Sequence, residues 1–195
     1  MSTAGPISLH ELRQNIPAME LLGQSFDIGI FLEDEPGDRF FVEPIQGIAV
    51  FAREGAGGRF AILESSGHIL YVSSEGAAGI VAASFPEFMH LVVACPYWQD
   101  LLHFSGNGKL HEMRSVLALL EDDAQDDTPD IDNAREILRR EMRLAAMGDP
   151  VELLHRAVSD TGKNITVRAS DGTAYATLFN HFTLADNPFW RDAVS

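Results

Sequence analysis

The stretch "YVSSEGAAGIVAASFPEFMHLVVACPYWQDLL", residues 71–102, contains a strand signal, a turn signal and a helix signal in succession. It begins as an apolar run and then passes through a turn spaced by glycines. In "SFPEF", Ser84 and Glu87 have the spacing of a helix capping box, which stabilises a helix by about 1 kcal/mol. Pro86 is tolerated in a first helical turn, and apolar residues follow at helical spacing. The stretch predicts a strand and then a buried helix that ends before Pro96.

The residues before this stretch predict more strands. Two apolar runs, 48–52 and 60–63, flank the glycine-rich loop "REGAGG" and indicate a β-hairpin. The next run, "HILYV" at 68–72, is apolar at successive positions, which indicates a strand covered on both faces. Further upstream, "DIGIFLEDEPGDRFFVEPI" at 27–45 predicts two strands joined by an acidic turn. The acidic side chains of this turn are Glu33, Asp34, Glu35 and Asp38.

The two ends of the chain are expected to contain helices. Near the N-terminus, Ser8 and Glu11 again have capping-box spacing, and Pro17 interrupts this helix or starts a second one. In the second half, helices are predicted over 109–121 and 133–147, joined by the acidic linker "DDAQDDTPDID".

The C-terminal part adds a last helix and a hairpin. Asp149 followed by Pro150 is a strong helix start. Asp171-Gly172 predicts a turn between strands at 165–169 and 173–179.

Together these elements predict an α+β fold with a twisted, mainly antiparallel sheet flanked by helices. The helical C-terminal extension is expected to end in a β-hairpin. The glycines of "GNG", residues 106–108, mark a boundary between an α+β domain at 1–108 and the extension at 109–195. The sequence leaves open whether the extension packs on the same core or forms its own.

Charge limits the kinds of partner. The chain has 29 acidic and 14 basic side chains, a formal net charge of −15. An acidic surface repels nucleic acid and anionic lipid, so neither is an expected partner, whereas a basic protein is attracted. Acidity also favours solubility on its own. The single cysteine and the absence of an apolar run of about 20 residues lead us to expect a cytoplasmic protein that does not enter membranes.

Metal sites are not expected from the sequence. His10-Glu11 and His111-Glu112 both lack the second histidine one helical turn later that a zinc site of this kind needs. The acidic run at 121–132 has no glycine and does not supply the ligand positions of an EF-hand. It is expected to be a solvated linker or an anionic docking surface.

Catalysis and cofactor binding are not expected either. The loop "GAGG" at 55–58 lacks the glycine spacing of a dinucleotide-binding loop and is better explained as a hairpin turn. Cys95 lies between an apolar helix and a proline, and the sequence places no imidazole beside it. We therefore expect a protein that is not an enzyme and holds no cofactor.

Three segments, "FAREGAGGRFAIL", "HILYVSSEGAAGIVAASFPEFMHLVV" and "PYWQDLL", resemble the SUKH superfamily in their order and content. The resemblance covers about residues 48–102, and residues 111–195 lie outside it. It implies an α+β fold without catalysis. Many members of that superfamily are immunity proteins that bind and neutralise bacterial toxins, often nucleases or deaminases, and others are general protein-interaction modules.

The resulting hypothesis is an immunity protein that binds a basic toxin domain by electrostatic complementarity. An interaction module without a toxin is the first alternative, and an enzyme or small-ligand binder assembled from distant residues is the second. The expected partner-binding residues are the acidic ones of the predicted turn and linker, namely Glu33, Asp34, Glu35, Asp38, Asp122, Asp123, Asp126 and Asp127.

Overall fold

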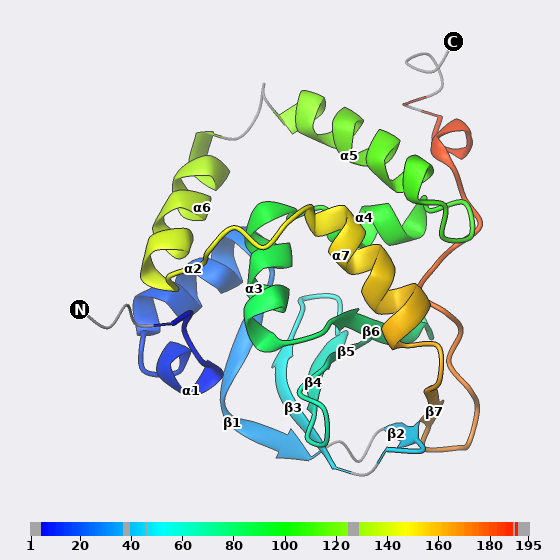
Figure 1. Ribbon diagram of the computed structural model, residues 1–195, viewed down its shortest axis with the longest axis horizontal. Coiled ribbons are helices and arrows are strands. Elements are labelled where there is room, and N and C mark those ends of the chain that lie inside the picture. Colours follow the sequence, from blue (N-terminus) through cyan, green and yellow to red (C-terminus); the bar gives the residue numbers. More distant parts are fainter. Residues whose placement is uncertain (1–4, 37–39, 46, 125–128, 189, 191–195) are drawn as a thin grey trace.

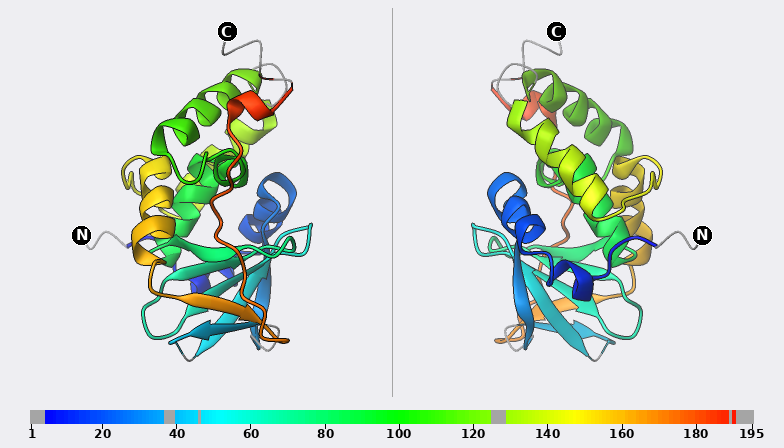
Figure 2. Two further views of the ribbon diagram at one scale, coloured as in Figure 1. Left: turned by 90° about the vertical axis from the view of Figure 1, so that its right-hand side faces the viewer. Right: turned by 90° about the vertical axis from the view of Figure 1, so that its left-hand side faces the viewer.

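The computed structural model describes residues 5–36, 40–45, 47–124, 129–188 and 190. It confirms the α+β class: an antiparallel five-stranded sheet lies between a layer of helices and a second, two-stranded sheet (Figures 1 and 2). The main sheet has the order β1-β3-β4-β5-β6, in which consecutive strands along the chain are neighbours once β2 is set aside. Its strands are β1 (Gly29–Pro36), β3 (Ile48–Arg53), β4 (Arg59–Leu63), β5 (Ile69–Val72) and β6 (Ala78–Ala82).

The central strands bury side chains on both faces of the main sheet. In β4 and β5, Phe60 and Tyr71 point toward the helices and belong to the larger core cluster. Their chain neighbours Ala61 and Leu70 point to the other face, into a smaller cluster under the two-stranded sheet. All four residues of β5 are buried. The two-sided strand predicted at 68–72 is therefore confirmed.

The two-stranded sheet joins distant parts of the chain. β2 (Phe40–Glu43) pairs antiparallel with β7 (Thr166–Ala169) and covers the smaller cluster. Its side chains alternate, so that Phe40 and Val42 are buried and Phe41 is 54% exposed on the outside. β7 begins the hairpin predicted around Asp171-Gly172, and that turn forms. The predicted second arm, 173–179, is not a strand: it makes one bridge to β7 and then runs beside residues 76–78.

The helix starts read from the sequence are largely confirmed. Helix α1 (Leu9–Leu12) has the full capping box of Ser8 and Glu11, and α2 (Ile16–Phe26) starts with a proline in its first turn. In α3 (Phe85–Ala94), Ser84 accepts from the N–H of Glu87 at 3.3 Å. The buried Glu87 carboxylate accepts from Ala83, one residue before the cap, so the predicted box is only half formed. A short helix, α4 (Trp98–His103), follows.

The described parts of the acidic run at 121–132 are helical, so the prediction of a linker was wrong at both of its ends. α5 (Leu110–Ala124) continues into the run, and α6 (Pro129–Glu141) begins inside it. Helix α6 begins early because acidic residues favour the first turn of a helix, where they face the positive end of its dipole. Residues 125–128, between the two helices, lie outside the described part.

Helices from the second half cover the same core as those from the first half. Leu138 of α6 and Leu154 of α7 (Pro150–Arg156) are fully buried in the larger cluster together with Phe88 of α3. The α7 helix is capped by Asp149, as predicted, and continues into a π-helical turn (Ala157–Thr161). No described helix has the length and apolarity needed to cross a membrane.

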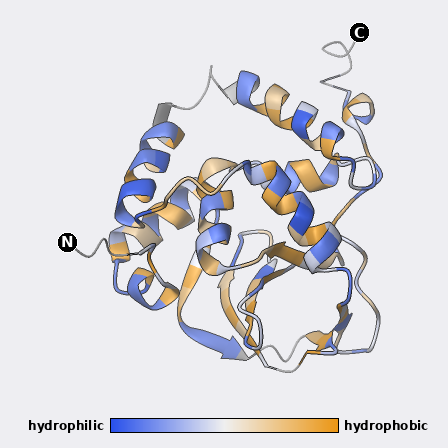
Figure 3. Cartoon of the chain, viewed as in Figure 1, coloured by the Kyte–Doolittle hydropathy of each residue, from blue (hydrophilic) through white to orange (hydrophobic). Residues whose placement is uncertain are grey.

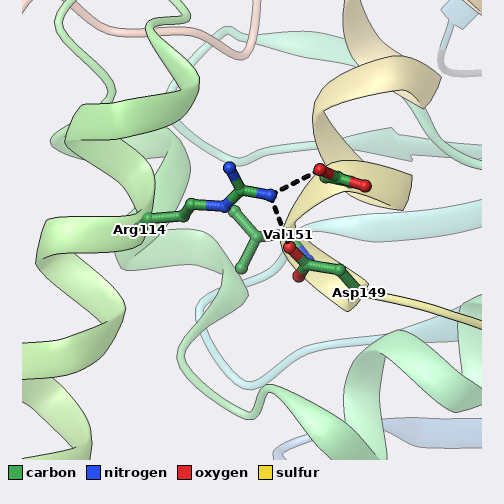
Figure 4. A network of polar contacts seen from close by, with 4 residues as sticks. Arg114, Asp149 and Val151 are labelled. Atoms are coloured by element: carbon green, nitrogen blue, oxygen red, sulfur yellow. Dashed lines mark hydrogen bonds and ion pairs between the residues drawn. The ribbon is translucent and has the colours of Figure 1, made fainter.

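An ion-pair network fixes α7 against α5 (Figure 4). The Arg114 guanidinium lies 2.9 Å from a carboxylate oxygen of Asp149 and 2.5 Å from one of Glu152. Burial raises the pKa of Asp149, but hydrogen bonds from Arg114 and from the N–H of Val151 outweigh it and lower the pKa overall. The cap of α7 is therefore also its contact with α5.

Glu11 links the N-terminal helix to the end of α6, and its pKa leads to a first prediction. The N–H of Ser8, the Arg143 guanidinium and the Ser8 hydroxyl lower the pKa of Glu11 from 4.5 to about 2. Because the folded pKa is depressed, the stabilisation is present above pH 4.5 and is lost as the pH falls toward 2. We expect Glu11→Gln to lower the melting temperature at neutral pH and to match the wild type near pH 2. Thermal unfolding followed by circular dichroism across this range tests it, and a constant difference at every pH would contradict it.

Candidate functional site

A recess of about 580 Å³ opens between the sheet and the helical layer. The turn between β3 and β4, the turn before β6, α4 and the segment 176–181 surround it. We call it the acidic recess, because four carboxylates line it and no lysine or arginine does so in the described part of the chain. These are Asp27, Glu54, Glu75 and Asp100.

Glu54 lies at the inner wall of the acidic recess and is only 6% exposed. The Tyr71 hydroxyl donates to one of its carboxylate oxygens at 2.6 Å. The side-chain amide of Gln99 donates to the other oxygen and also contacts the Tyr71 hydroxyl at 3.1 Å. Both donors are neutral, and no described cation forms an ion pair with Glu54. Glu54 is thus a buried carboxyl group that is hydrogen-bonded to neutral donors and has no described ion-pair partner.

The hairpin turn after β3 places this carboxylate. Glu54 is the first residue after β3, and its N–H and C=O both bond within the turn, to the C=O of Gly58 and the N–H of Gly57. A Cβ built at Gly58 collides with the Glu54 carboxylate and lies 2.9 Å from a ring carbon of Tyr71. Glycine is therefore needed at 58 so that Glu54 can fold back against Tyr71.

Asp27 holds the same turn from outside. Its two oxygens each accept from the N–H of Gly55 at 3.0 Å. Asp27 ends α2 in the left-handed conformation, with φ of 54°, which aspartate tolerates better than most residues. Because its only described partner is a neutral N–H, Asp27 adds a second uncompensated charge to the acidic recess.

Asp100 faces the recess from α4. Its side chain keeps an exposed surface, yet the recess walls remove enough water to raise the pKa of its carboxyl, an effect that nearby His103 partly opposes. Burial and the hydrogen bond to Glu54 likewise raise the pKa of Tyr71. Two groups with raised pKa therefore share one concave site, a combination that is enriched at functional sites.

The C-terminal segment forms the remaining wall and is anchored to α4 and the "GNG" turn. The N–H of Asn180 donates to Leu102 at 3.1 Å, and its C=O accepts from Asn107 at 2.8 Å and from the Ser105 hydroxyl at 2.9 Å. Figure 2 shows this segment (orange) leaving the two-stranded sheet and rising toward α5. It brings His181 to the recess, where His103 also lies.

The structure places the predicted partner-binding residues elsewhere. Glu33, Asp34 and Glu35 lie within β1 and not in a turn, because a bulge between Ile30 and Glu35 lengthens this strand. Figure 3 shows that the end of β1 is hydrophilic. The side chains of the three are exposed, and that of Asp34 is paired with Arg13 at 2.5 Å.

The described members of the second predicted group lie at the other end of the molecule from the tip of β1 (Figure 1). Asp122 and Asp123 belong to the end of α5 (Figure 1), and Asp122 is exposed. Asp38, Asp126 and Asp127 lie outside the described residues. The described members of the two groups do not share one surface.

Sequence reasoning missed the acidic recess because its carboxylates are far apart in the chain, at 27, 54, 75 and 100. The one local feature was that Glu54 directly precedes the glycine-rich turn after β3. Among the described residues, no group of three or more histidine, cysteine, aspartate or glutamate side chains has the geometry of a metal site.

Comparison with known proteins gives no assignment. No protein-family model matches the sequence, and no curated protein or solved structure is significantly similar to the chain. The function is therefore inferred from the site itself.

Proposed function

We propose that this chain is a non-enzymatic, cytoplasmic binding domain of the immunity-protein kind that neutralises a basic bacterial toxin domain. The observation that carries the proposal is the acidic recess, whose four carboxylates have no lysine or arginine beside them in the described lining. A toxin that acts on nucleic acid needs a cationic cleft, and an acidic partner can occupy that cleft. The net charge of −15 and the resemblance of residues 48–102 to the SUKH superfamily support the same proposal.

The salt dependence of complex formation tests this proposal. The probe is the product of the neighbouring open reading frame where that frame encodes a basic toxin domain, purified as an inactive variant. We expect its association rate constant to fall by at least about tenfold between roughly 50 and 500 mM salt, because long-range attraction between opposite charges is screened. Biolayer interferometry measures this rate. A tight complex whose association rate constant does not change with salt concentration would contradict the electrostatic mechanism. Failure of this protein to protect cells from the active toxin would contradict the immunity function.

A small-ligand binder is a second candidate, since the recess is concave and contains two groups with raised pKa. Its volume lies within the usual range of ligand sites, about 300–1,000 Å³. An interaction module without a toxin is the other candidate. The product of the neighbouring gene distinguishes these candidate functions. A gene that encodes a basic toxin domain favours the immunity function, and a gene that encodes a metabolic enzyme favours the small-ligand binder.

A further inference from the structure

We infer that the acidic recess is a binding site for a guanidinium group, and that its occupant in a complex is an arginine side chain of the protein partner. The choice of a protein as the source of this group rests on the proposed function. The site itself rests on geometry that is independent of any partner.

The first step is the uncompensated charge of Glu54. Removing a carboxylate from water is costly unless a cation and hydrogen bonds compensate it. Glu54 has two hydrogen bonds but no described cation, and it lines an open cavity. Each of its oxygens accepts one described hydrogen bond, and a carboxylate oxygen can accept a second, so the existing bonds do not use up its acceptor capacity. A cation entering the recess offsets the cost that the folded chain already bears.

The second step is the distribution of the other charges. Asp27, Glu75 and Asp100 line the same cavity from three different elements, and no described side chain forms an ion pair with any of them. Glu75 and Asp100 make no described side-chain hydrogen bond, so both carboxylates are free to accept from a ligand. Carboxylates on several sides suit a group that donates in several directions.

The third step selects guanidinium over ammonium. A guanidinium has five N–H donors in one plane, is less strongly hydrated than an ammonium, and stacks on flat rings. The recess supplies flat rings as well as acceptors, because Phe179, His103 and His181 all line it. An ammonium is a compact, strongly hydrated charge and makes less use of such walls.

Binding of a capped arginine tests the inference without the partner. Nα-acetyl-arginine amide carries only the side-chain charge, and Nα-acetyl-citrulline amide is its neutral analogue of nearly the same shape. We expect the arginine compound to shift the backbone N–H signal of Gly55 and the side-chain amide of Gln99 in a nitrogen-15 NMR titration of the full chain. The citrulline compound should bind at least about tenfold more weakly, because it lacks the charge. Equal affinity of the two overturns the inference, and equal affinity of the lysine analogue overturns the choice of guanidinium.

Two variants and a matched control locate the site. Glu54→Gln and Asp100→Asn each remove one charge from the recess, and Asp100 makes no described side-chain hydrogen bond, so its replacement leaves the buried network intact. Glu35→Gln removes an exposed charge from β1, outside the recess. We expect at least about a fivefold loss of arginine affinity in both recess variants and no loss in the control. If both single variants, Asp100→Asn and Glu54→Gln, bind capped arginine as tightly as the wild type, the inference is overturned.

The same variants separate this inference from the proposed function. If the toxin complex forms with its expected salt dependence but is weakened by Glu35→Gln and not by the recess variants, the immunity function stands and the arginine site is wrong. If capped arginine binds as expected but no toxin is neutralised, the site stands and the proposed function is wrong.

Discussion

Replacing Phe60 with alanine is expected to lower the free energy of unfolding by about 3–5 kcal/mol, the usual cost of removing a buried aromatic ring. Phe60 is fully buried in β4, and its ring lies 5.0 Å from the centroids of both Tyr71 and Phe88 and 6.0 Å from that of Trp98. It therefore joins the sheet to α3 and α4. Since domains of this size are stable by only about 5–15 kcal/mol, the loss is a large part of the total.

Phe41→Ala is the matched control for this prediction. Phe41 is the same residue type in a strand, but it is 54% exposed on the outer face of β2. We expect its replacement to change the free energy of unfolding by about 0.5 kcal/mol or less. Urea unfolding followed by tryptophan fluorescence measures both variants. Equal losses of unfolding free energy in the two variants would mean that the aromatic cluster around Phe60 does not stabilise the core.

The strand that contains Phe60 could be predicted from the sequence because local patterns determine which strands and helices form here. The apolar runs around "REGAGG" and "HILYV", and the caps at Ser8, Ser84 and Asp149, each act within a few residues. An apolar strand without alternation has to be covered on both faces, and that constraint alone fixes the place of β5 between two layers.

Strand pairings and sites that depend on residues far apart in the chain could not be predicted from such local patterns. Nothing near β2 in the chain indicates that its partner is β7, more than a hundred residues later. The second arm of the C-terminal hairpin has strand-like residues, yet it leaves β7 because residues 76–78 offer it other hydrogen-bond partners. The acidic recess is missed for the same reason.

The secondary structure of the two acidic runs was predicted wrongly for a different physical reason. A run of acidic residues favours the prediction of a turn or linker, because charged side chains avoid the core. An exposed strand edge or a helix end also keeps such side chains in water. Glu33 and Asp34 lie within the bulged stretch of β1 and Glu35 follows it, whereas Asp122 lies at the exposed end of α5. By contrast, the carboxylate of Glu54 is buried and lies in a cavity, so it is the one whose environment calls for a chemical explanation.

Replacing Tyr71 with phenylalanine tests that explanation through stability, and we expect a loss of about 1–3 kcal/mol. Phenylalanine preserves the packing against Phe60 and Trp98, so the loss isolates the hydroxyl that donates to Glu54 at 2.6 Å. Tyr175→Phe is the matched control, since Tyr175 is only partly buried and its hydroxyl makes no described hydrogen bond. A loss in Tyr71→Phe no larger than in this control would show that the buried bond contributes little.

A double-mutant cycle and a pH series determine whether the loss comes from the Glu54 carboxylate. In the Glu54→Gln background, Tyr71→Phe should cost less, with a coupling free energy of about 0.5–3 kcal/mol. Burial and the bond to Glu54 raise the pKa of Tyr71, so the folded chain keeps this proton above pH 10.0 while the unfolded chain releases it. The stabilisation is therefore complete below pH 10.0 and declines above it, and the difference between wild type and Tyr71→Phe should narrow there. Urea unfolding at neutral pH and at about pH 11 measures this. A difference that stays constant or widens would show that the Tyr71 hydroxyl is not held protonated beside a charged Glu54, and would remove the basis for a cation site in the acidic recess.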